Sequence, residues 1–283
     1  MKTITANKIS ETVKGLCIKA NLFLRKDALS SLKLAYRREK NKRSKTLLYS
    51  IIKNSYIARD EKIAICQDTG MPVVFIEIGQ DVKVKGDFKK AVNSGVEAGY
   101  KKGYLRNSII LDPILRGKPE YSPAVIHTDI VKGNKLKITV LPKGFGCENK
   151  SALRMFLPTT RIEDIKNFII DTLKRAGPDA CPPYVVGIGI GGTADYASLL
   201  AKKALLKGLS PSKLYQGQAK GAVPKLEKEL LFRINKLNIG PMGLGGKTTA
   251  LAVSIETYPT HIAGLPVAVN ISCHALRSAT AIL

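Results

Sequence analysis

Residues 184–193 read YVVGIGIGGT, and this stretch decides how the second half of the chain folds. The first seven residues are mostly β-branched or small and predict a strand, and residues 194–207 have the apolar spacing of a helix. Glycines at the junction allow a tight turn and close packing, because no side chain stands in the way. The sequence therefore predicts a strand, a turn, and a helix with Thr193 as its N-cap, whose N-terminus is able to face an anion.

The glycines of this stretch also match a dinucleotide fingerprint. Gly187, Gly189 and Gly192 have the spacing G-x-G-x-x-G between a predicted strand and a predicted helix. A dinucleotide site needs an acidic residue about twenty positions later to bind a ribose. No Asp or Glu occurs between Tyr196 and Leu226. We therefore interpret these glycines as a packing feature rather than as part of a nicotinamide or flavin site.

The remaining pattern predicts an α+β fold, in which a helical N-terminal region is followed by mixed β-sheets flanked by helices. Residues 1–60 have helical spacing, and residues 61–283 alternate strands with helices and should form one intertwined unit. Within the second region the predicted helices are 87–102, 161–175 and 194–207, and the predicted strands are 63–66, 72–78, 184–190, 249–255 and 266–273.

Two further β-rich runs, 124–131 and 135–141, are joined around Gly133 and Asn134. Short connections of Gly and Asn are typical of the tight turns between antiparallel neighbours. The sequence predicts a β-hairpin here.

The chain has 283 residues, with 46 Lys and Arg against 22 Asp and Glu, which gives a formal net charge of +24. Because 45% of the residues are apolar, the chain can bury a core and is not a disordered polycation. No charge-free apolar run reaches the length of about 18 residues that a membrane span needs. The excess charge indicates an anionic counterpart, which could be nucleic acid, an acidic membrane surface, an anionic substrate or an acidic partner subunit.

The most basic segment, residues 37–45, contains no aromatic residue on which a base could stack. We interpret it as a solvated helix end.

The N-terminus and the cysteines predict a cytoplasmic protein. Residues 1–4 lead into polar sequence rather than into the apolar core of a signal peptide. The cysteines are odd in number and widely spread, which fits a reducing compartment; they are Cys17, Cys66, Cys147, Cys181 and Cys273.

Two other glycine-rich segments could contact an anion. Residues 240–248, GPMGLGGKT, resemble a phosphate-binding P-loop, but Pro241 removes a backbone N–H and Gly240 stands one position too early. We do not expect an NTPase. Residues 143–151, KGFGCENKS, carry many backbone donors and two lysines. They either close over an anion or form a plain loop with solvated lysines.

Four segments in the same order resemble the class I, iron–sulfur fumarate hydratases and the related L-tartrate dehydratases. They are residues 65–70 (ICQDTG), 179–193 (DACPPYVVGIGIGGT), 240–250 (GPMGLGGKTTA) and 270–273 (NISC). The resemblance covers nearly the whole chain. It implies that this chain is similar to the α subunit, which is equivalent to the N-terminal part of the family's longer members.

The resemblance implies a [4Fe–4S] cluster held by Cys66, Cys181 and Cys273. Three thiolates leave one iron open, and an open iron acts as a Lewis acid rather than as an electron carrier. The spacing alone, without any C-x-x-C pair, would favour buried structural cysteines. At Cys147 the family more often has serine, and a thiolate there could protect or block the open iron.

The resemblance also implies a substrate site. Asp68 matches the family's acid/base, although a residue in such a turn can also serve only as a cap of its own turn. Gln67 and Arg106 match substrate-binding residues, and a planar guanidinium suits a carboxylate. His261, twelve residues before Cys273, matches a histidine that binds substrate or handles a proton.

These features predict the α subunit of a [4Fe–4S]-dependent hydro-lyase that interconverts fumarate and S-malate, a reaction of the tricarboxylic acid cycle. The α subunit of an L-tartrate dehydratase is the alternative. A basic nucleic-acid-binding protein is the alternative from another class, supported only by the net charge of +24. The expected partners are a small dicarboxylate and a less basic β subunit in a heterotetramer, with neither membrane nor nucleic acid. Because the β subunit supplies the rest of the pocket, the chain alone should be inactive or nearly so.

Overall fold

The computed structural model describes residues 2–209 and 221–283, which divide into two compact units. Unit 1 comprises Met1–Arg25, Asn54–Phe145 and Arg277–Leu283, and unit 2 comprises Lys26–Lys53 and Gly146–Leu276. The predicted α+β class is confirmed. The three N-terminal helices are divided between the units and are α1 (Ala6–Leu22) in unit 1, α2 (Lys26–Arg38) in unit 2 and α3 (Lys42–Glu61), which runs from unit 2 into unit 1.

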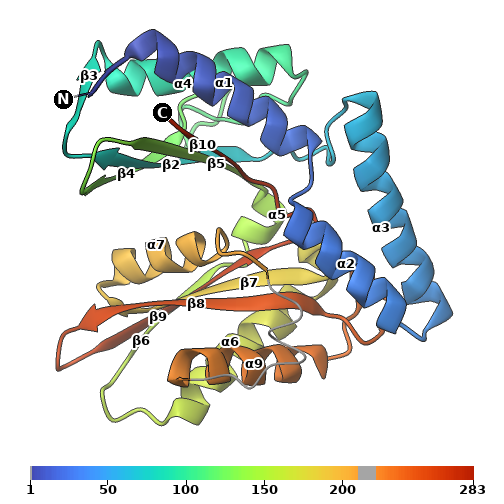
Figure 1. Ribbon diagram of the computed structural model, residues 1–283. Helices are drawn as coiled ribbons and strands as arrows, with labels where there is room; N and C mark the ends of the chain where they lie inside the picture. Colours follow the sequence, from blue (N-terminus) through green and yellow to red (C-terminus); the bar gives the residue numbers. More distant parts are fainter. Residues whose placement is uncertain (1, 210–220) are drawn as a thin grey trace. The chain divides into compact units, whose positions relative to one another are not determined.

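Unit 1 is built on a four-stranded mixed sheet. Its further elements are β1 (Lys2–Thr5), β2 (Met71–Gly79), β3 (Val82–Lys85), α4 (Phe88–Lys102), β4 (Val125–Val131), β5 (Leu136–Lys143) and β10 (Ala279–Ile282). The strand order is β10-β5-β2-β4, while β1 and β3 form a separate parallel pair. Helices α1 and α4 lie together on one face of the four-stranded sheet (Figure 1). The core of unit 1 lies between these two layers.

Local sequence explains where α1 and α4 begin and why they pack closely. The side chain of Thr5 caps α1 by accepting from Lys8 N at 3.3 Å, and α1 then buries apolar residues at helical spacing. The predicted helix 87–102 is confirmed as α4, and the side chain of Asp87 caps it by accepting from Lys90 N at 2.9 Å. A Cβ added at Gly95 of α4 would lie 2.5 Å from the carbonyl oxygen of Ser10 in α1. Glycine therefore lets the two helix backbones approach each other.

The predicted hairpin of residues 124–131 and 135–141 is wrong, because β2 lies between its two strands. β4 pairs with β2 in parallel, and β5 pairs with the other edge of β2 in antiparallel. The connection between β4 and β5 crosses the end of β2, where Gly79 N donates to Lys135 O at 2.8 Å. A central strand needs partners for its backbone on both edges, and this long-range requirement outweighs the local turn signal.

The predicted strand 63–66 is also wrong, and this segment is a loop. Its backbone groups bond outside any sheet, since Ile65 N donates to Asn21 O at 3.0 Å and Asn54 Nδ2 donates to Ile65 O at 2.9 Å. Side-chain and helix-end partners therefore satisfy the backbone that a neighbouring strand would otherwise satisfy.

Unit 2 is built on a second four-stranded sheet with helices on both faces. Its further elements are α5 (Phe145–Glu148) at its border with unit 1, β6 (Ala152–Phe156), α6 (Ile162–Ala176), β7 (Tyr184–Gly192), α7 (Ala194–Ala204), α9 (Ala222–Asn235), β8 (Ala250–Thr260) and β9 (Leu265–Ser272), with short 3-10 turns at Gly177–Ala180 and Pro241–Gly243. The strand order is β6-β9-β7-β8. Figure 1 shows α7 on one face of this sheet and α6 and α9 on the other. The predicted strands 184–190, 249–255 and 266–273 and the predicted helix 161–175 are confirmed.

The glycines of β7 are a packing feature, as predicted. A Cβ added at Gly187 would lie 2.1 Å from Ala201 O, and one added at Gly189 would lie 2.0 Å from Ala197 O. Helix α7 thus rests directly on the backbone of β7. Thr193 is the N-cap of α7, but its hydroxyl donates to Asp195 Oδ1 at 2.6 Å instead of capping a backbone N–H.

The basic segment 37–45 spans the end of α2 and the start of α3. Most of its Lys and Arg side chains are exposed, as expected of a solvated helix end. Its single acid, Glu39, is only 3% exposed, and Ser44 is fully buried. The segment therefore also forms the joint of α2 and α3, in which these two polar side chains are buried. Within residues 2–209 and 221–283, no helix is long and apolar enough to cross a membrane.

Candidate functional site

The carboxylate of Asp68 is held in the loop between α3 and β2 of unit 1. Its Oδ1 accepts from Gly70 N at 3.0 Å, which is the local turn cap considered from the sequence. Its Oδ2 accepts from Phe145 N at 2.9 Å, and a Cβ added at Gly144 would lie 3.2 Å from the same oxygen. The first residues of the glycine-rich segment 143–151 therefore lie against this carboxylate. Each oxygen keeps a second lone pair with which Asp68 can accept a proton.

Two buried side chains hold the backbone of the Asp68 loop. The hydroxyl of Tyr100 lies 3.1 Å from Thr69 O and 2.9 Å from Gly70 O. Arg277 Nη2 donates to Asp68 O at 2.7 Å. Tyr100 is 1% exposed and Arg277 is 3% exposed. Burial raises the pKa of Tyr100, so its phenol stays protonated and continues to donate.

Arg277 has few partners for a buried cation. Its Nη1 donates to Asn21 Oδ1 at 3.3 Å, and its Nε is buried without a hydrogen-bond partner among the described residues. Sequence reasoning missed both Arg277 and Tyr100. One arginine among 46 basic residues resembles a surface cation, and a tyrosine in the last turn of a helix carries no signal of its own. The one available hint is that Arg277 follows Cys273 by four positions.

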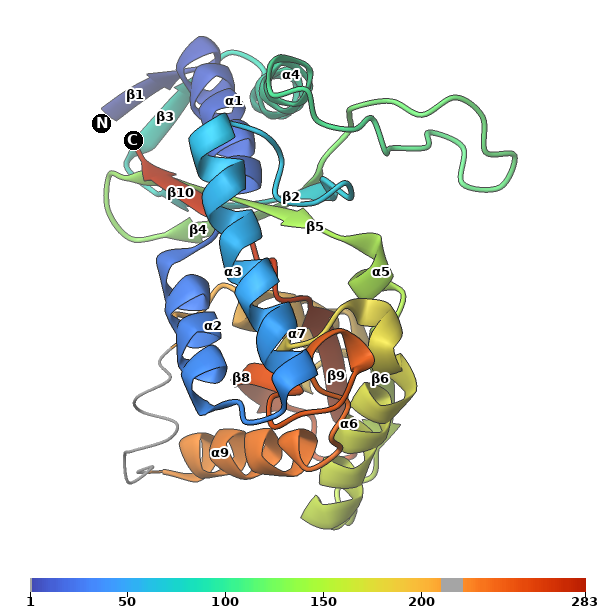
Figure 2. The ribbon, with the colours of Figure 1, turned by 90° about the vertical axis from the view of Figure 1, so that its right-hand side faces the viewer.

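Arg106 is tied to the same loop through its backbone. It lies at the start of the connection between α4 and β4, which runs out from the sheet (Figure 2). Thr69 Oγ1 accepts from Arg106 N at 3.0 Å, while the Arg106 side chain is exposed. Cys66 Sγ donates to Gln67 Oε1 at 3.3 Å. The structure therefore brings Cys66, Gln67, Asp68 and Arg106 together within unit 1.

Cys181 and Cys273 lie at the same end of the sheet in unit 2. β7 begins just after Cys181 and β9 ends just before Cys273, and the two strands pair antiparallel with Val185 opposite Ser272. His274 N and Nδ1 lie 3.4 Å and 3.0 Å from Cys181 O. Both cysteines are partly exposed. Cys181 has a φ of 51°, a left-handed conformation that is uncommon outside glycine.

Cys147 is buried beside this end of the sheet. Its Sγ donates to the carbonyl oxygen of Ala180, the residue before Cys181, at 3.2 Å. Lys150 Nζ pairs with Asp179 Oδ2 at 2.9 Å and ties the same two segments together. A serine hydroxyl could make the bond that the Cys147 thiol makes.

The structure does not bring His261 together with these cysteines. It lies in the connection between β8 and β9, at the end of the sheet where Ile190 pairs with Val267. The length of β9 separates that end from Cys273. The imidazole is exposed, and its Nδ1 accepts from Ala263 N at 3.2 Å.

A metal site is not assembled by any one cluster of side chains. Among residues 2–209 and 221–283, no three His, Cys, Asp or Glu side chains lie close enough together to hold a metal ion. Cys66 belongs to unit 1, whereas Cys181 and Cys273 belong to unit 2. Their joint role as ligands stays a prediction.

The glycine-rich segment 240–248 does not form a phosphate cradle. In a P-loop, consecutive backbone N–H groups point at the phosphate. Here they are used internally: the donors are the backbone N–H groups of Gly243, Leu244, Gly245, Gly246 and Lys247, and the acceptors are Gly240 O, Pro241 O, Ile239 O, Asn238 Oδ1 and Glu39 Oε2. The expectation that the segment is not an NTPase motif agrees with this geometry.

Comparison with known proteins shows that the sequence of this chain is similar to those of hydro-lyases. The sequence model of the family described as fumarate hydratase (Fumerase) matches residues 10–282. The chain is 42% identical over 280 residues to a putative L(+)-tartrate dehydratase subunit alpha of Methanocaldococcus jannaschii, covering 96% of each chain. It is 28% identical over 283 residues to the L(+)-tartrate dehydratase subunit alpha of Escherichia coli K12, covering 99% of this chain and 92% of that protein.

Proposed function

The chain belongs to the fumarate hydratase (Fumerase) family, and from this premise we propose that it is the α subunit of a hydro-lyase that adds water to fumarate and removes it from S-malate. The observation that carries the proposal is the bond from Arg106 N to Thr69 Oγ1, at 3.0 Å. It holds the backbone of Arg106 beside the loop that presents the Asp68 carboxylate, from which the Arg106 side chain can reach a ligand at that loop. A four-carbon dicarboxylate needs both a cation for its carboxylate and a nearby group that moves a proton.

Arg106 binds one carboxylate of the substrate in this proposal. A guanidinium can donate two parallel charge-assisted hydrogen bonds to a carboxylate. The Arg106 side chain is exposed and forms no ion pair within the described ranges, so its donors are available to a ligand. Gln67, which is also exposed, orients the substrate with its amide.

Asp68 exchanges the proton of the substrate's hydroxyl group. The two backbone donors on its carboxylate, Gly70 N and Phe145 N, fix its orientation and leave lone pairs for the proton. Tyr100 and Arg277 position the loop that carries it, because they bond its backbone rather than the carboxylate. His261 stays a prediction as a substrate-binding residue, and its surroundings support it less than those of Gln67 and Arg106.

We assign a [4Fe–4S] cluster to Cys66, Cys181 and Cys273. Thiolates are the usual ligands of such clusters, and these three thiols are the partly exposed ones in the chain. Cys17 differs, because burial raises the pKa of its thiol to about 12. When bound, the cluster supplies an open iron that polarises the C–O bond of the substrate as a Lewis acid.

We propose further that the active protein is a heterotetramer with a β subunit. The support is that the relatives described above are named as alpha subunits. The β subunit supplies the remaining substrate-binding groups and is less basic than this chain, whose net charge of +24 favours an acidic neighbour.

Dehydration of L(+)-tartrate is the second candidate, and the names of the relatives favour it. Malate and tartrate are both four-carbon dicarboxylates with a hydroxyl next to a carboxylate. Asp68, Gln67 and Arg106 could therefore serve either substrate. Comparing kcat/KM for malate and tartrate in the αβ complex decides between the two.

The test of the proposed chemistry uses the αβ complex purified without oxygen. Replacing the acid/base in Asp68→Asn should lower kcat for both directions by about 10²-fold or more. Asp81→Asn, at an exposed turn of unit 1, is the matched control and should leave kcat unchanged. Full activity of the Asp68→Asn complex would contradict the role of Asp68.

The cluster is tested separately on the chain alone by iron and sulfide analysis after anaerobic reconstitution. Cys66→Ala, Cys181→Ala and Cys273→Ala should each lower the iron content. Cys147→Ser is the control, because a hydroxyl can still donate to Ala180 O. The reconstituted chain should show no turnover until the β subunit is added, and strong activity without it would contradict the proposed division of the site.

A further inference from the structure

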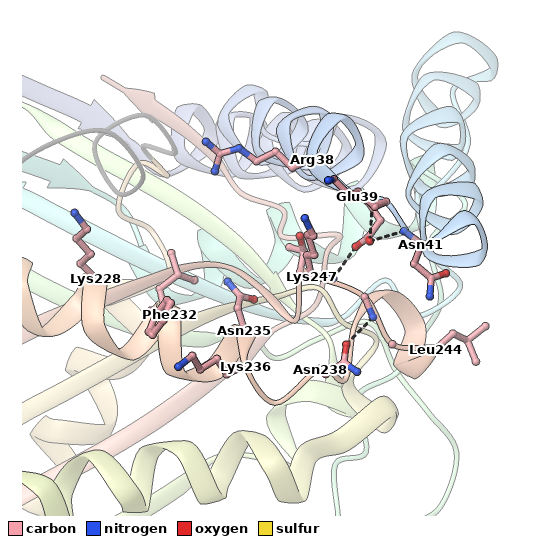
Figure 3. Close-up of a pocket in the computed structure, with 15 residues that line it drawn as sticks. Arg38, Glu39, Asn41, Lys228, Phe232, Asn235, Lys236, Asn238, Leu244 and Lys247 are labelled. Atoms are coloured by element: carbon pink, nitrogen blue, oxygen red, sulfur yellow. Dashed lines mark hydrogen bonds between the residues drawn. The ribbon is translucent and has the colours of Figure 1, made fainter.

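Unit 2 contains a cavity that the proposed hydro-lyase chemistry does not use. It has a volume of about 1060 Å³ and lies between the joint of α2 and α3, the exposed side of α9 and the glycine-rich segment 240–248 (Figure 3). This volume is slightly above the range of about 300–1,000 Å³ typical of ligand pockets. All of its lining belongs to unit 2, so the cavity is defined within one compact body.

The cavity is strongly basic even for this chain. Five of its 15 lining residues are cations, whereas 46 of 283 residues in the whole chain are. These five are Arg38, Lys40, Lys228, Lys236 and Lys247. Figure 3 shows Lys228 and Asn235 rising from α9 toward the space below Arg38, with Lys247 between the two elements.

One acid, Glu39, also lies in the lining, so five cations and one carboxylate leave a formal net charge of +4 there. Glu39 is 3% exposed, and its carboxylate accepts from three backbone N–H groups. The donors are Lys40 N and Asn41 N, both at 2.9 Å, and Lys247 N at 2.7 Å. The side chains of Lys40 and Lys247 form no ion pair within residues 2–209 and 221–283.

Two amides of the lining, those of Asn235 and Asn238, offer N–H donors to a ligand. Asn235 Oδ1 accepts from Thr249 N and Ala250 N, and Asn238 Oδ1 accepts from Gly246 N. Both lone pairs of Asn235 Oδ1 are therefore used, and both amides keep N–H groups that can donate to a ligand. Together with the five cations, these donors favour a ligand that is rich in acceptors and negatively charged.

The lining also contains exposed apolar side chains, with Phe232 and Leu244 on different sides of the cavity (Figure 3). Phe232 is 60% exposed and Leu244 is 57% exposed, and Lys236 Nζ lies 4.4 Å from the centroid of the Phe232 ring. An exposed aromatic ring beside several cations is suited to a ligand that joins a flat base to phosphates. The backbone N–H groups of the glycine-rich segment are used internally, so side chains would supply the recognition.

We propose that this cavity binds a nucleoside polyphosphate, with the phosphates on the lysines and the base on Phe232. The site binds without hydrolysis, because the carboxylate of Glu39 is held by backbone donors and is not placed to carry a metal ion. This site is independent of the proposed hydro-lyase activity.

The proposal is tested by calorimetric titration of the full chain, and of the αβ complex, with ATP. ATP should bind saturably with one site per chain. Lys40→Ala and Lys247→Ala should each weaken binding by about tenfold, the effect of losing one charge-assisted hydrogen bond. Lys225→Ala, which removes the same charge from α9 outside the cavity, should change the affinity by less than about twofold.

Two further titrations distinguish the contribution of the base to the affinity from that of the phosphates. Tripolyphosphate should bind more weakly than ATP, and Phe232→Ala should weaken ATP while leaving tripolyphosphate unchanged. The proposal is overturned if ATP does not bind saturably, if tripolyphosphate binds as tightly as ATP, or if Lys225→Ala weakens binding as much as Lys247→Ala. Loss of ATP binding in the αβ complex alone would also overturn it and would assign the cavity to a protein partner.

Discussion

Unit 1 and unit 2 both present candidate cysteine ligands, but they position them by different means. In unit 1 the loop with Cys66 and Asp68 is held by two buried side chains, Tyr100 and Arg277, that bond its backbone. In unit 2, Cys181 and Cys273 adjoin the ends of two paired strands, so the register of the sheet sets their positions.

This difference predicts two kinds of sensitivity. Strand register rests on many backbone hydrogen bonds and on the packing of the whole sheet, so a site at strand ends should be lost only together with the sheet. A loop held by two side chains can be displaced by one substitution while the rest of the unit stays folded. The predictions below test this contrast, beginning with the largest effect.

The largest effect is expected for Gly189→Ala in unit 2. The added Cβ would lie 2.0 Å from Ala197 O, and the contact is with helix backbone that cannot turn aside. Separating α7 from β7 should cost about 3 kcal/mol or more of the free energy of unfolding. Urea unfolding followed by far-UV circular dichroism measures this loss.

Gly15→Ala in unit 1 is the matched control for this substitution. Gly15 lies inside α1 with no heavy atom within 4 Å of the added Cβ. Alanine there should raise the free energy of unfolding by about 0.5–1 kcal/mol, since it favours the helix. If Gly189→Ala were as stable as Gly15→Ala, the packing of α7 on β7 would not determine the unit 2 site.

The next effect is expected for Arg277→Met in unit 1. The change leaves Asp68 O and Asn21 Oδ1 without their donor, and each buried acceptor left unpaired costs about 1–3 kcal/mol. Because Arg277 bonds the backbone of the Asp68 loop, kcat of the αβ complex should fall by about tenfold or more while KM changes little.

Arg277→Lys keeps the charge but not the two-pronged geometry, so its kcat should lie between those of the wild type and of Arg277→Met. If Arg277→Lys lost as much kcat and as much stability as Arg277→Met, Arg277 would have a structural role only. Unchanged kcat in Arg277→Met would contradict a positioning role.

The contrast between the units also explains what could be predicted from sequence. The strand at 184–190, the helix after it and the packing role of Gly189 were predicted, because they depend on neighbours along the chain. The insertion of β2 between β4 and β5 was not, because it depends on which distant strand satisfies a backbone edge. The local Gly133-Asn134 signal pointed to the wrong partner.

The candidate site likewise contains residues that could be predicted from the sequence and one that could not. Cys66, Gln67 and Asp68 are contiguous and could be named as a motif. Arg277 could not, since a buried arginine and an exposed one look alike in sequence. Its role follows only from a bond between residues that are 209 positions apart.

A smaller effect is expected for Tyr100→Phe in unit 1. The substitution removes the hydroxyl that bonds Thr69 O and Gly70 O but keeps the buried ring. The free energy of unfolding should fall by about 1–2 kcal/mol. Tyr104→Phe is the control, because Tyr104 is 96% exposed and should show no change. Equal stability of the two variants would mean that the loop is held by Arg277 alone.

The smallest effect concerns the acid stability of unit 2, where ion pairs between Glu163 and Arg233 and between Lys166 and Glu229 join α6 to α9. Hydrogen bonds from Arg233 and then Lys166 lower the pKa of Glu163 from its usual 4.5 to about 2. A folded pKa below the unfolded one stabilises the fold above pH 4.5, and this contribution is lost as the pH falls from 4.5 toward 2.

The urea midpoint of the wild type should therefore fall more steeply across that pH range than the midpoint of Glu163→Gln, which lacks the titrating group. Arg233→Gln should remove most of the same pH dependence, and the double variant should add little to either, because the two side chains act as a pair. Additive effects of the two substitutions would show instead that these residues act separately on the α6–α9 face.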